Sequence, residues 1–270
     1  MGVGFAQQHL HRNAFSSRRF LADDKIPLWM MLEVPTCPRS NSVLYPSRWN
    51  AVLVELSRIQ VLPGERLLLR DIDWTEFETI LLDLGDRRNS RIAYYQGLLE
   101  VMAPSPEHES YKDCLGDVVK ILLIEWDITA YPLGSTTLSK RSLGSGIEPD
   151  QCFYITNAIA VQGRKRLDLE VDPPPDLAIE IDVTSRTHLE IYAALGVQEV
   201  WRFSQSQLEI HQLQQGAYQL CPESQFFPGR DLVSQITQFI QQAQTESWNT
   251  AYKAFRDWAI ANRPPSQPLT

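Results

Sequence analysis

Apolar residues recur every three to four positions in several segments of the chain, and this spacing predicts amphipathic helices. The longest segment follows Ser105-Pro106, an N-capping serine and a proline at the first helical position, and its apolar residues continue to Trp126. Shorter helices are predicted over residues 73–84, 185–195, 232–243 and 248–259. Glycine follows the first two of these at positions 85 and 196, where it favours a helix end.

Short runs rich in β-branched and aromatic residues, bounded by turn residues, predict the strands. Arg91–Tyr95 and Leu98–Met102 are separated by Gln96-Gly97, which is typical of a tight hairpin turn. Further strands are predicted over residues 128–131, 136–141, 150–155, 199–203 and 208–213. Gly134 and the segment 144–146 are predicted to form turns between them.

The segment 176–183, which follows three consecutive prolines, alternates between apolar and mostly acidic residues. One set of alternate positions holds Leu177, Ile179, Ile181 and Val183, and the other holds Asp176, Ala178, Glu180 and Asp182. The alternation predicts a strand with one apolar face and one acidic face.

The acidic face has two interpretations. It is either a solvated or charge-protected sheet surface, or part of a cation site to which Asp150, after Pro149, adds a carboxylate beside Glu180. Carboxylates that converge in a half-buried cleft repel one another unless a cation neutralises them. Hard oxygen ligands of this kind suit Mg²⁺ or Mn²⁺.

The net charge bears on the choice of partner. Formal charge is −8 for the 270 residues, so nucleic-acid binding needs a local basic patch rather than the surface as a whole. Two basic runs provide candidates, Arg87, Arg88 and Arg91 in one and Arg164-Lys165-Arg166 in the other. The alternative for each run is a solvated loop.

Composition excludes several classes of protein. With 43% hydrophobic residues, the chain has enough apolar material for one large domain or two small ones. No apolar run reaches the roughly 18 residues of a membrane helix and no signal-peptide core is present, so we expect a cytoplasmic protein without a membrane partner. The cysteines are too widely separated for a zinc site or a disulfide framework: Cys37, Cys114, Cys152 and Cys221.

Five motifs in order resemble the Uma2 family of the PD-(D/E)XK restriction-endonuclease-like superfamily. They are YYQGLLEVMAP (94–104), His108 at the start of a helix, GIEPDQCFYI (146–155), PDLAIEIDVTS (175–185) and IYAALGVQEVWRF (191–203). The resemblance implies an α/β fold with a mixed central β-sheet flanked by helices, an N-terminal β-hairpin and C-terminal helices. It covers a Uma2-like endonuclease domain over 73–225. Outside it, the lack of a sustained period and the prolines predict a poorly structured extension over 1–72, and the helical spacing predicts a helical extension over 226–270.

The resemblance also implies a site for Mg²⁺ or Mn²⁺. Asp150 matches the aspartate of the PD motif and Glu180 the acidic residue of the (D/E)XK motif, so both are expected to be metal ligands and catalytic residues. Glu100 matches a further acidic position, and its alternative is a solvent-facing strand residue. Asp182 stands where the superfamily motif has lysine, and His188 stands where many family members supply a lysine from the next helix. His188 is therefore the third candidate catalytic residue, since imidazole can donate to phosphate or accept a proton from water.

Three other side chains have structural interpretations. His108 shares a helix face with Tyr111 and Leu115, so we expect it to point inward and to bond to the backbone. Tyr192 and Trp201 are expected to be core aromatics.

Three functions remain open. The resemblance favours a metal-dependent endonuclease that hydrolyses phosphodiester bonds in DNA. The missing lysine and the acidic net charge favour a non-catalytic binding or regulatory module of the same fold. A small-molecule hydrolase has only the acidic cluster in its favour, and a homodimer is left open.

Overall fold

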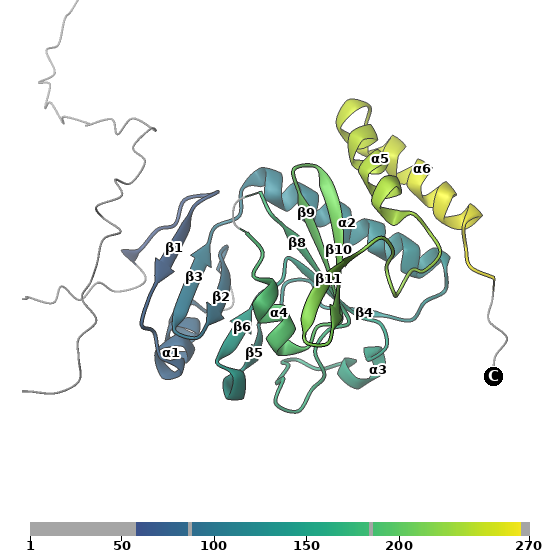
Figure 1. Cartoon of the computed structure of the whole chain (residues 1–270). Coiled ribbons are helices and arrows are strands. Elements are labelled where there is room, and N and C mark those ends of the chain that lie inside the picture. Colours follow the sequence, from purple (N-terminus) through teal and green to yellow (C-terminus); the bar gives the residue numbers. More distant parts are fainter. Residues whose placement is uncertain (1–57, 86–87, 184–185, 266–270) are drawn as a thin grey trace, which may run out of the picture. The chain divides into compact units, whose positions relative to one another are not determined.

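The structure is a computed structural model that describes residues 58–85, 88–183 and 186–265 (Figure 1). In this part of the chain the strands form a five-stranded sheet and a six-stranded sheet. The sequence expectations for residues 1–57, Arg87 and Ser185 lie outside the described residues.

The first sheet is antiparallel, with strand order β1-β3-β2-β6-β5. Its strands are β1 (Arg66–Leu69), β2 (Arg91–Tyr95), β3 (Leu98–Met102), β5 (Leu138–Lys140) and β6 (Ser145–Ile147). The predicted hairpin between β2 and β3 is confirmed, because Gln96 and Gly97 both have positive φ, as a tight primed turn requires. Helix α1 (Trp74–Leu84) covers this sheet, with Phe77 and Ile80 in the shared core.

The second sheet is mixed, with strand order β11-β10-β9-β8-β7-β4. Its strands are β4 (Tyr131–Pro132), β7 (Gln151–Tyr154), β8 (Leu177–Ile181), β9 (Glu199–Ser204), β10 (Gln207–Gln214) and β11 (Ala217–Cys221). Strands β8 and β9 are parallel and are connected by helix α4 (Leu189–Leu195), since parallel neighbours need a crossover connection. The other neighbouring pairs are antiparallel.

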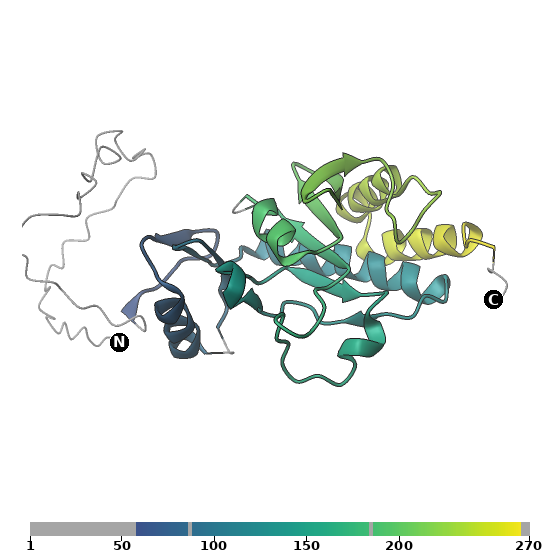
Figure 2. The ribbon, with the colours of Figure 1, turned by 60° about the horizontal axis from the view of Figure 1, so that its bottom comes forward.

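Helices cover both faces of the second sheet. The apolar side chains Leu177, Ile179 and Ile181 of β8 share a core with α2 (Pro106–Glu125), α5 (Leu232–Thr245) and α6 (Trp248–Ala261). Helix α4 lies on the opposite face, where Tyr192 packs with Ala178 (Figure 1). Helix α6 runs beside α2 (Figure 2), and Trp126 Nε1 donates to the Ala259 carbonyl at 2.8 Å. The expected α/β class with a mixed central sheet flanked by helices is confirmed.

Several local expectations are wrong, and each has a physical reason. Residues 145–147 form β6 instead of a turn. Gly146 has no Cβ atom, and Phe77 of α1 lies only 2.9 Å from the place that a Cβ atom would occupy, so the absence of a side chain lets this strand pack closely against the helix. The expected strand 128–131 is reduced to Tyr131 in β4, since the Ile128 amide instead closes the end of α2 by donating to the Leu123 carbonyl.

The helix expected over 185–195 begins only at Leu189. Thr187 donates from both its amide and its hydroxyl to Asp182 Oδ1, which holds the preceding residues in a loop. His188 is therefore the N-cap residue of α4 and does not lie within its first turn. Val183 follows the end of β8 and is 41% exposed, so it is not part of the apolar face.

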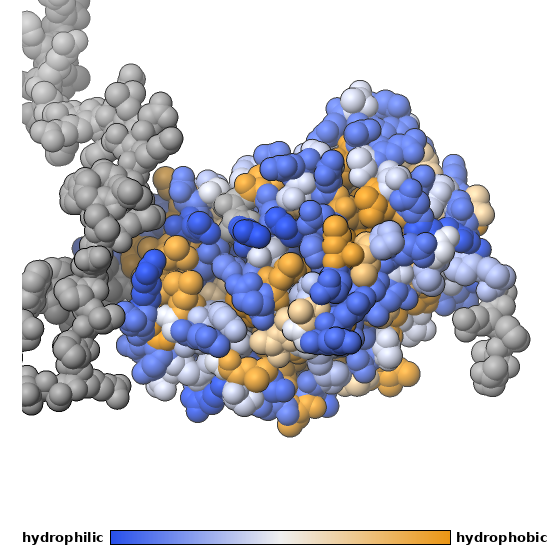
Figure 3. Space-filling view, in the orientation of Figure 1, coloured by the Kyte–Doolittle hydropathy of each residue, from blue (hydrophilic) through white to orange (hydrophobic). Residues whose placement is uncertain are grey.

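Elements without a clear sequence pattern are β1, β11 and the short helix α3 (Ala158–Val161), together with the 3₁₀ turn Arg141–Leu143. The surface that Figure 3 shows is mainly hydrophilic, with hydrophobic residues in small separate groups. No helix within the described ranges is long and apolar enough to cross a membrane.

Candidate functional site

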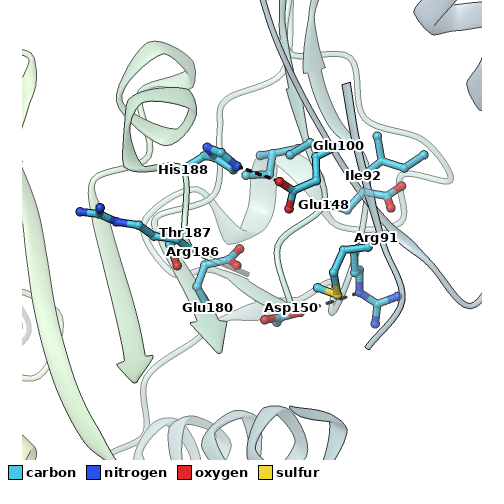
Figure 4. A pocket seen from close by; sticks show the side chains of 12 residues that line it. Arg91, Ile92, Glu100, Glu148, Asp150, Glu180, Arg186, Thr187 and His188 are labelled. Atoms are coloured by element: carbon cyan, nitrogen blue, oxygen red, sulfur yellow. Dashed lines mark ion pairs between the residues drawn. The ribbon is translucent and has the colours of Figure 1, made fainter. Parts of the chain in front are cut away.

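A small pocket lies where β2 and β3 of the first sheet meet β8 and the N-terminus of α4 (Figure 4). Most of its lining side chains are charged or polar. The lining consists of Arg91, Ile92, Ala93, Glu100, Met102, Ile147, Glu148, Asp150, Glu180, Arg186, Thr187 and His188. The pocket, which we call the carboxylate pocket, thus contains every site residue expected from the sequence: Glu100, Asp150, Glu180 and His188.

Strand pairing brings Asp150 and Glu180 together. Gln151 of β7 pairs with Ile179 of β8 in antiparallel register, so the next step of that register sets position 150 opposite position 180. Both side chains point to the same side of the sheet and lie next to each other in the pocket (Figure 4). The chain therefore places two carboxylates from different segments side by side.

Asp150 is almost completely buried, with 2% exposure, and three groups surround its carboxylate. The Ile181 amide donates to Oδ2 at 2.9 Å, and His108 Nε2 lies 3.0 Å from the same oxygen. Arg91 Nε lies 3.9 Å from Oδ1. The contacts at Oδ2 fix the orientation of the carboxylate, so Oδ1 is the oxygen better placed to bind a further cation.

Glu180 bears an electrostatic cost in this position. Burial raises its pKa well above the ordinary value, and the neighbouring Asp150 charge raises it further. The hydroxyl of Tyr192 opposes this effect by donating a hydrogen bond to Glu180 Oε1. The ionised form of Glu180 is therefore disfavoured in this position, and a cation beside the two carboxylates would stabilise it.

Glu100 and His188 form a second pair at the edge of the pocket. Glu100 is 5% exposed in β3, and Arg66 donates to it at 3.3 Å. His188 Nε2 lies 3.5 Å from Glu100 Oε2, and its Nδ1 lies 3.1 Å from Glu190 Oε1. Glu100 is buried and faces the pocket, so the alternative of a solvent-facing strand residue is wrong.

These contacts shift the pKa values of Glu100 and His188 in the directions expected of an ion pair. Burial raises the pKa of Glu100, but hydrogen bonds and charges from His188 and Arg66 outweigh it and leave that pKa below its ordinary value. The hydrogen bond with Glu100 raises the pKa of His188 despite partial burial, and Glu190 adds to the effect. The imidazolium form is thereby favoured over a wider pH range.

The remaining acidic residues of the strand 176–183 have other partners. Asp176 accepts hydrogen bonds from the Ile155 and Asn157 amides and so holds the turn after β7. Asp182 accepts from Thr187 and from Arg202 Nε at 2.5 Å. Of the three acidic residues of this strand, only Glu180 lines the carboxylate pocket. Asp176 and Asp182 bind other groups of the protein, so the interpretation of a purely solvated acidic face is wrong.

Two contacts at the site have no counterpart in the sequence expectations, one made by Glu148, which lines the pocket, and one made by Tyr192, which lies behind Glu180. Glu148 is 9% exposed, accepts from the Thr137 hydroxyl at 2.6 Å and forms an ion pair with Arg88. Tyr192 is a fully buried core aromatic, as expected, but its contact with Glu180 was missed. Neither contact has a local sequence signal, because the two partners of each contact belong to different elements of the fold.

His108 points inward, as expected, and is completely buried. The expected bond to the backbone is wrong, because neither ring nitrogen has a partner with hydrogen-bond geometry among the described residues. Its nearest charged neighbours are Asp150 and, at 3.5 Å from Nδ1, Glu109. Trp201 is a core aromatic, as expected, and donates to Glu199 Oε1 at 2.6 Å.

The donor set fits a magnesium-like cation. No group of three or more His, Cys, Asp or Glu side chains in the described part of the chain is arranged to hold a metal ion. Mg²⁺, however, commonly retains several waters and uses only one or two carboxylates of the protein. Asp150 and Glu180 provide such a pair. Burial and then the neighbouring Asp150 charge raise the pKa of Glu180, and a divalent cation beside both carboxylates would favour their ionised forms.

Comparison with known proteins gives a match to one family model over residues 74–240, described as "Uma2: Putative restriction endonuclease". A similar solved structure is described as "a putative nuclease belonging to DUF820" from Anabaena variabilis ATCC 29413. It is 14% identical, with a TM-score of 0.41, over 54% of this chain and 88% of that chain. Comparison with curated protein sequences gives no significant match.

Proposed function

Since the chain belongs to the Uma2 family, we propose that it is a metal-dependent endonuclease that hydrolyses phosphodiester bonds in DNA. The observation that carries this proposal is the adjacent pair Asp150 and Glu180 in a pocket also lined by Arg91, Arg186 and His188. Two carboxylates with cationic side chains around them suit a bound divalent cation and a phosphate at the same time.

Asp150 and Glu180 are the residues that would hold Mg²⁺ or Mn²⁺. When bound, such a cation supplies positive charge for a phosphate oxygen and lowers the pKa of a water molecule. The Ile181 amide keeps Asp150 in one orientation by its hydrogen bond, and the His108 ring lies against the same oxygen. The Tyr192 hydroxyl does the same for Glu180 and favours its ionised form.

His188 is proposed to orient the attacking water or a phosphate oxygen. Its position at the N-cap of α4 puts the imidazole at the pocket edge, and the pair with Glu100 favours the protonated form. A protonated imidazole donates hydrogen bonds and has positive charge, which are two of the properties that lysine provides. Asp182 does not replace the lysine, because it is acidic and bound to Arg202 and Thr187.

A second function, a non-catalytic binding or regulatory module, is favoured by one observation. No lysine lines the carboxylate pocket in the described residues, and the cations Arg88 and Arg91 near it are engaged with Glu148, Asp150 and Glu109. Such a module would bind a cation without turning over a phosphodiester. The two functions differ in cleavage, not in fold.

The test is a cleavage assay on supercoiled plasmid and on a labelled oligonucleotide, with Mg²⁺, Mn²⁺ or EDTA. We expect nicking and linearisation with either cation, none in EDTA, and a loss of at least about 10²-fold in Asp150→Ala and Glu180→Gln. Asp113→Ala removes an exposed carboxylate of α2 and is the matched control. Activity that Asp150→Ala retains in full would contradict the proposal, and an inactive wild type that still binds the cation would favour the regulatory module.

A further inference from the structure

Two grooves adjoin the carboxylate pocket on different sides. The first, the hydroxyl groove, is lined by the basic residues Arg88, Arg91, Lys165 and Arg166 and by five serines and threonines. The second, the arginine groove, is lined by Arg66, Arg186 and Arg202, with Asp182 and Ser204.

The three spaces are neighbours that share lining residues. Arg91 and Glu148 line both the carboxylate pocket and the hydroxyl groove, and Arg186 lines both the carboxylate pocket and the arginine groove. Figure 4 shows Arg91 and Arg186 on opposite sides of Asp150 and Glu180. The carboxylate pair therefore lies between the two grooves, and we call the row of three spaces the depression.

Charge is unevenly distributed along this depression. The hydroxyl groove has four cationic residues against the single carboxylate of Glu148, and the arginine groove has three against the single carboxylate of Asp182. The whole chain has a formal charge of −8, so this excess of positive charge does not follow from average composition. An anionic polymer would be attracted to these grooves and repelled by most of the remaining surface.

Two of the cations are available for a ligand. Arg88, Arg91 and Arg202 already form ion pairs with acidic side chains of the protein. Lys165 and Arg186 are both exposed, and neither has an ion pair with any other residue that the structure describes. One lies in the hydroxyl groove and the other in the arginine groove, so the carboxylate pair has an available cation on each side.

The fold also joins the two basic runs that were separate candidates in the sequence. Arg88 and Arg91 precede and begin β2, whereas Lys165 and Arg166 follow α3, yet all four line the hydroxyl groove. Serine and threonine hydroxyls beside them are common donors to phosphate oxygens. The interpretation of these runs as separate solvated loops does not account for this convergence.

We propose that the two grooves hold the backbone phosphates of one nucleic-acid strand on either side of the phosphodiester in the carboxylate pocket. Lys165 contacts the phosphates on the hydroxyl-groove side and Arg186 those on the arginine-groove side. A linear polymer with phosphates at regular intervals fits an anion-binding groove, a cation-binding centre and a second anion-binding groove in succession, which a single phosphate does not. The inference rests on the proposed function and adds the path of the substrate.

The test measures binding rather than cleavage, on the full chain in EDTA. Anisotropy of a fluorescein-labelled DNA duplex and of its single strand is followed over a series of salt concentrations. We expect Lys165→Ala and Arg186→Ala each to weaken binding and to reduce the slope of log K against log salt by about 0.9 on the duplex or 0.7 on the single strand. Lys165→Arg and Arg186→Lys retain the charge and should retain most of the slope.

Lys253→Ala is the matched control, because it removes an exposed cation from α6, outside the three spaces. The inference is overturned if wild type does not bind DNA, if neither alanine variant differs from Lys253→Ala, or if polyglutamate competes as well as DNA of equal charge. Because EDTA prevents metal-dependent turnover, the two proposals can fail separately. A protein that binds through Lys165 and Arg186 but never cleaves would retain this inference and refute the nuclease.

Discussion

The Tyr192 hydroxyl donates a hydrogen bond to Glu180 Oε1, so a residue of α4 holds a carboxylate of β8 across the face of the central sheet. This bond lowers the pKa of Glu180, whereas burial and Asp150 raise it, and the net shift is upward. The carboxylate is thus oriented for a ligand but costly to ionise while no cation is bound.

Glu180→Gln is expected to stabilise the cation-free protein at neutral pH. A raised native pKa means that wild type loses stability as pH rises above the ordinary value of 4.5 towards the native pKa, and glutamine removes that loss while keeping an acceptor for Tyr192. The gain should be near zero at pH 4 and of the order of 1 kcal/mol at pH 7. Thermal unfolding of both proteins in EDTA across this range measures it.

The same variant should lose its response to metal. Mg²⁺ or Mn²⁺ is expected to raise the Tm of wild type, because a ligand that binds only the native state stabilises it by mass action. Glu180→Gln should show little or no rise. Equal binding by wild type and variant in titration calorimetry would place the cation site elsewhere.

Tyr192→Phe is expected to weaken cation binding without removing a ligand. Loss of the hydroxyl leaves Glu180 harder to ionise and costs about 1 kcal/mol of stability. The Mn²⁺ concentration at half-maximal Tm shift should therefore increase. Tyr218→Phe removes a comparable hydrogen bond, to the Val197 carbonyl, and should destabilise the protein with no change in the Mn²⁺ response.

The pair of His188 and Glu100 should stabilise the fold within a limited pH window. The raised pKa of His188 gives stability that is complete below 6.5 and lost as pH rises through the native value. The lowered pKa of Glu100 gives stability that is complete above 4.5 and lost as pH falls through its native value. In a double-mutant cycle with His188→Ala and Glu100→Gln, we expect a coupling of about 0.5–1 kcal/mol at pH 5.5 that declines at pH 9. A coupling independent of pH would contradict the ion pair.

His188→Lys is expected to raise metal-dependent cleavage, by up to about 10²- to 10³-fold, because lysine brings a permanent charge to the place where phosphate charge develops. Native activity should change with pH above 6.5, since the pKa of His188 is raised. Cleavage by wild type, His188→Ala and His188→Lys is compared at saturating Mn²⁺ across that range. Three indistinguishable profiles would show that residue 188 takes no part.

Gly146→Ala should destabilise the protein by about 1–3 kcal/mol, because the added Cβ would meet Phe77 Cζ at 2.9 Å and Ser139 Cβ at 3.3 Å. Urea unfolding measures the loss. Phe77→Leu in the Gly146→Ala background should recover part of it, and a double variant that is merely additive would argue against the close contact.

The local sequence pattern predicts those helix ends and turns whose stabilising contacts are between residues close together in the chain. The N-cap Ser105 and the capping box of Asp73 with Glu76 are present where helices were expected, since capping depends on residues three positions apart. The hairpin turn at Gln96-Gly97 likewise depends on two adjacent residues. The apolar face of β8 followed from alternation alone.

Elements that depend on distant partners were decided by tertiary structure. Strand β1 has partly exposed residues and no strong pattern, and it exists through pairing with β3. Residues 145–147 have the composition of a turn, but pairing with β2 and β5 and the close approach of Phe77 make them a strand.

For the candidate site too, the sequence indicated some features and only the tertiary structure showed the others. The sequence alone brought forward Glu100, Asp150, Glu180 and His188 as candidates through their resemblance to the family motifs, and the structure places all four in one pocket. It did not reveal which partner each of them has. Tyr192 on Glu180, His108 beside Asp150, and Lys165 in one groove with Arg91 all join different elements of the fold. Such contacts are set by strand register and helix packing, which no local pattern of residues encodes.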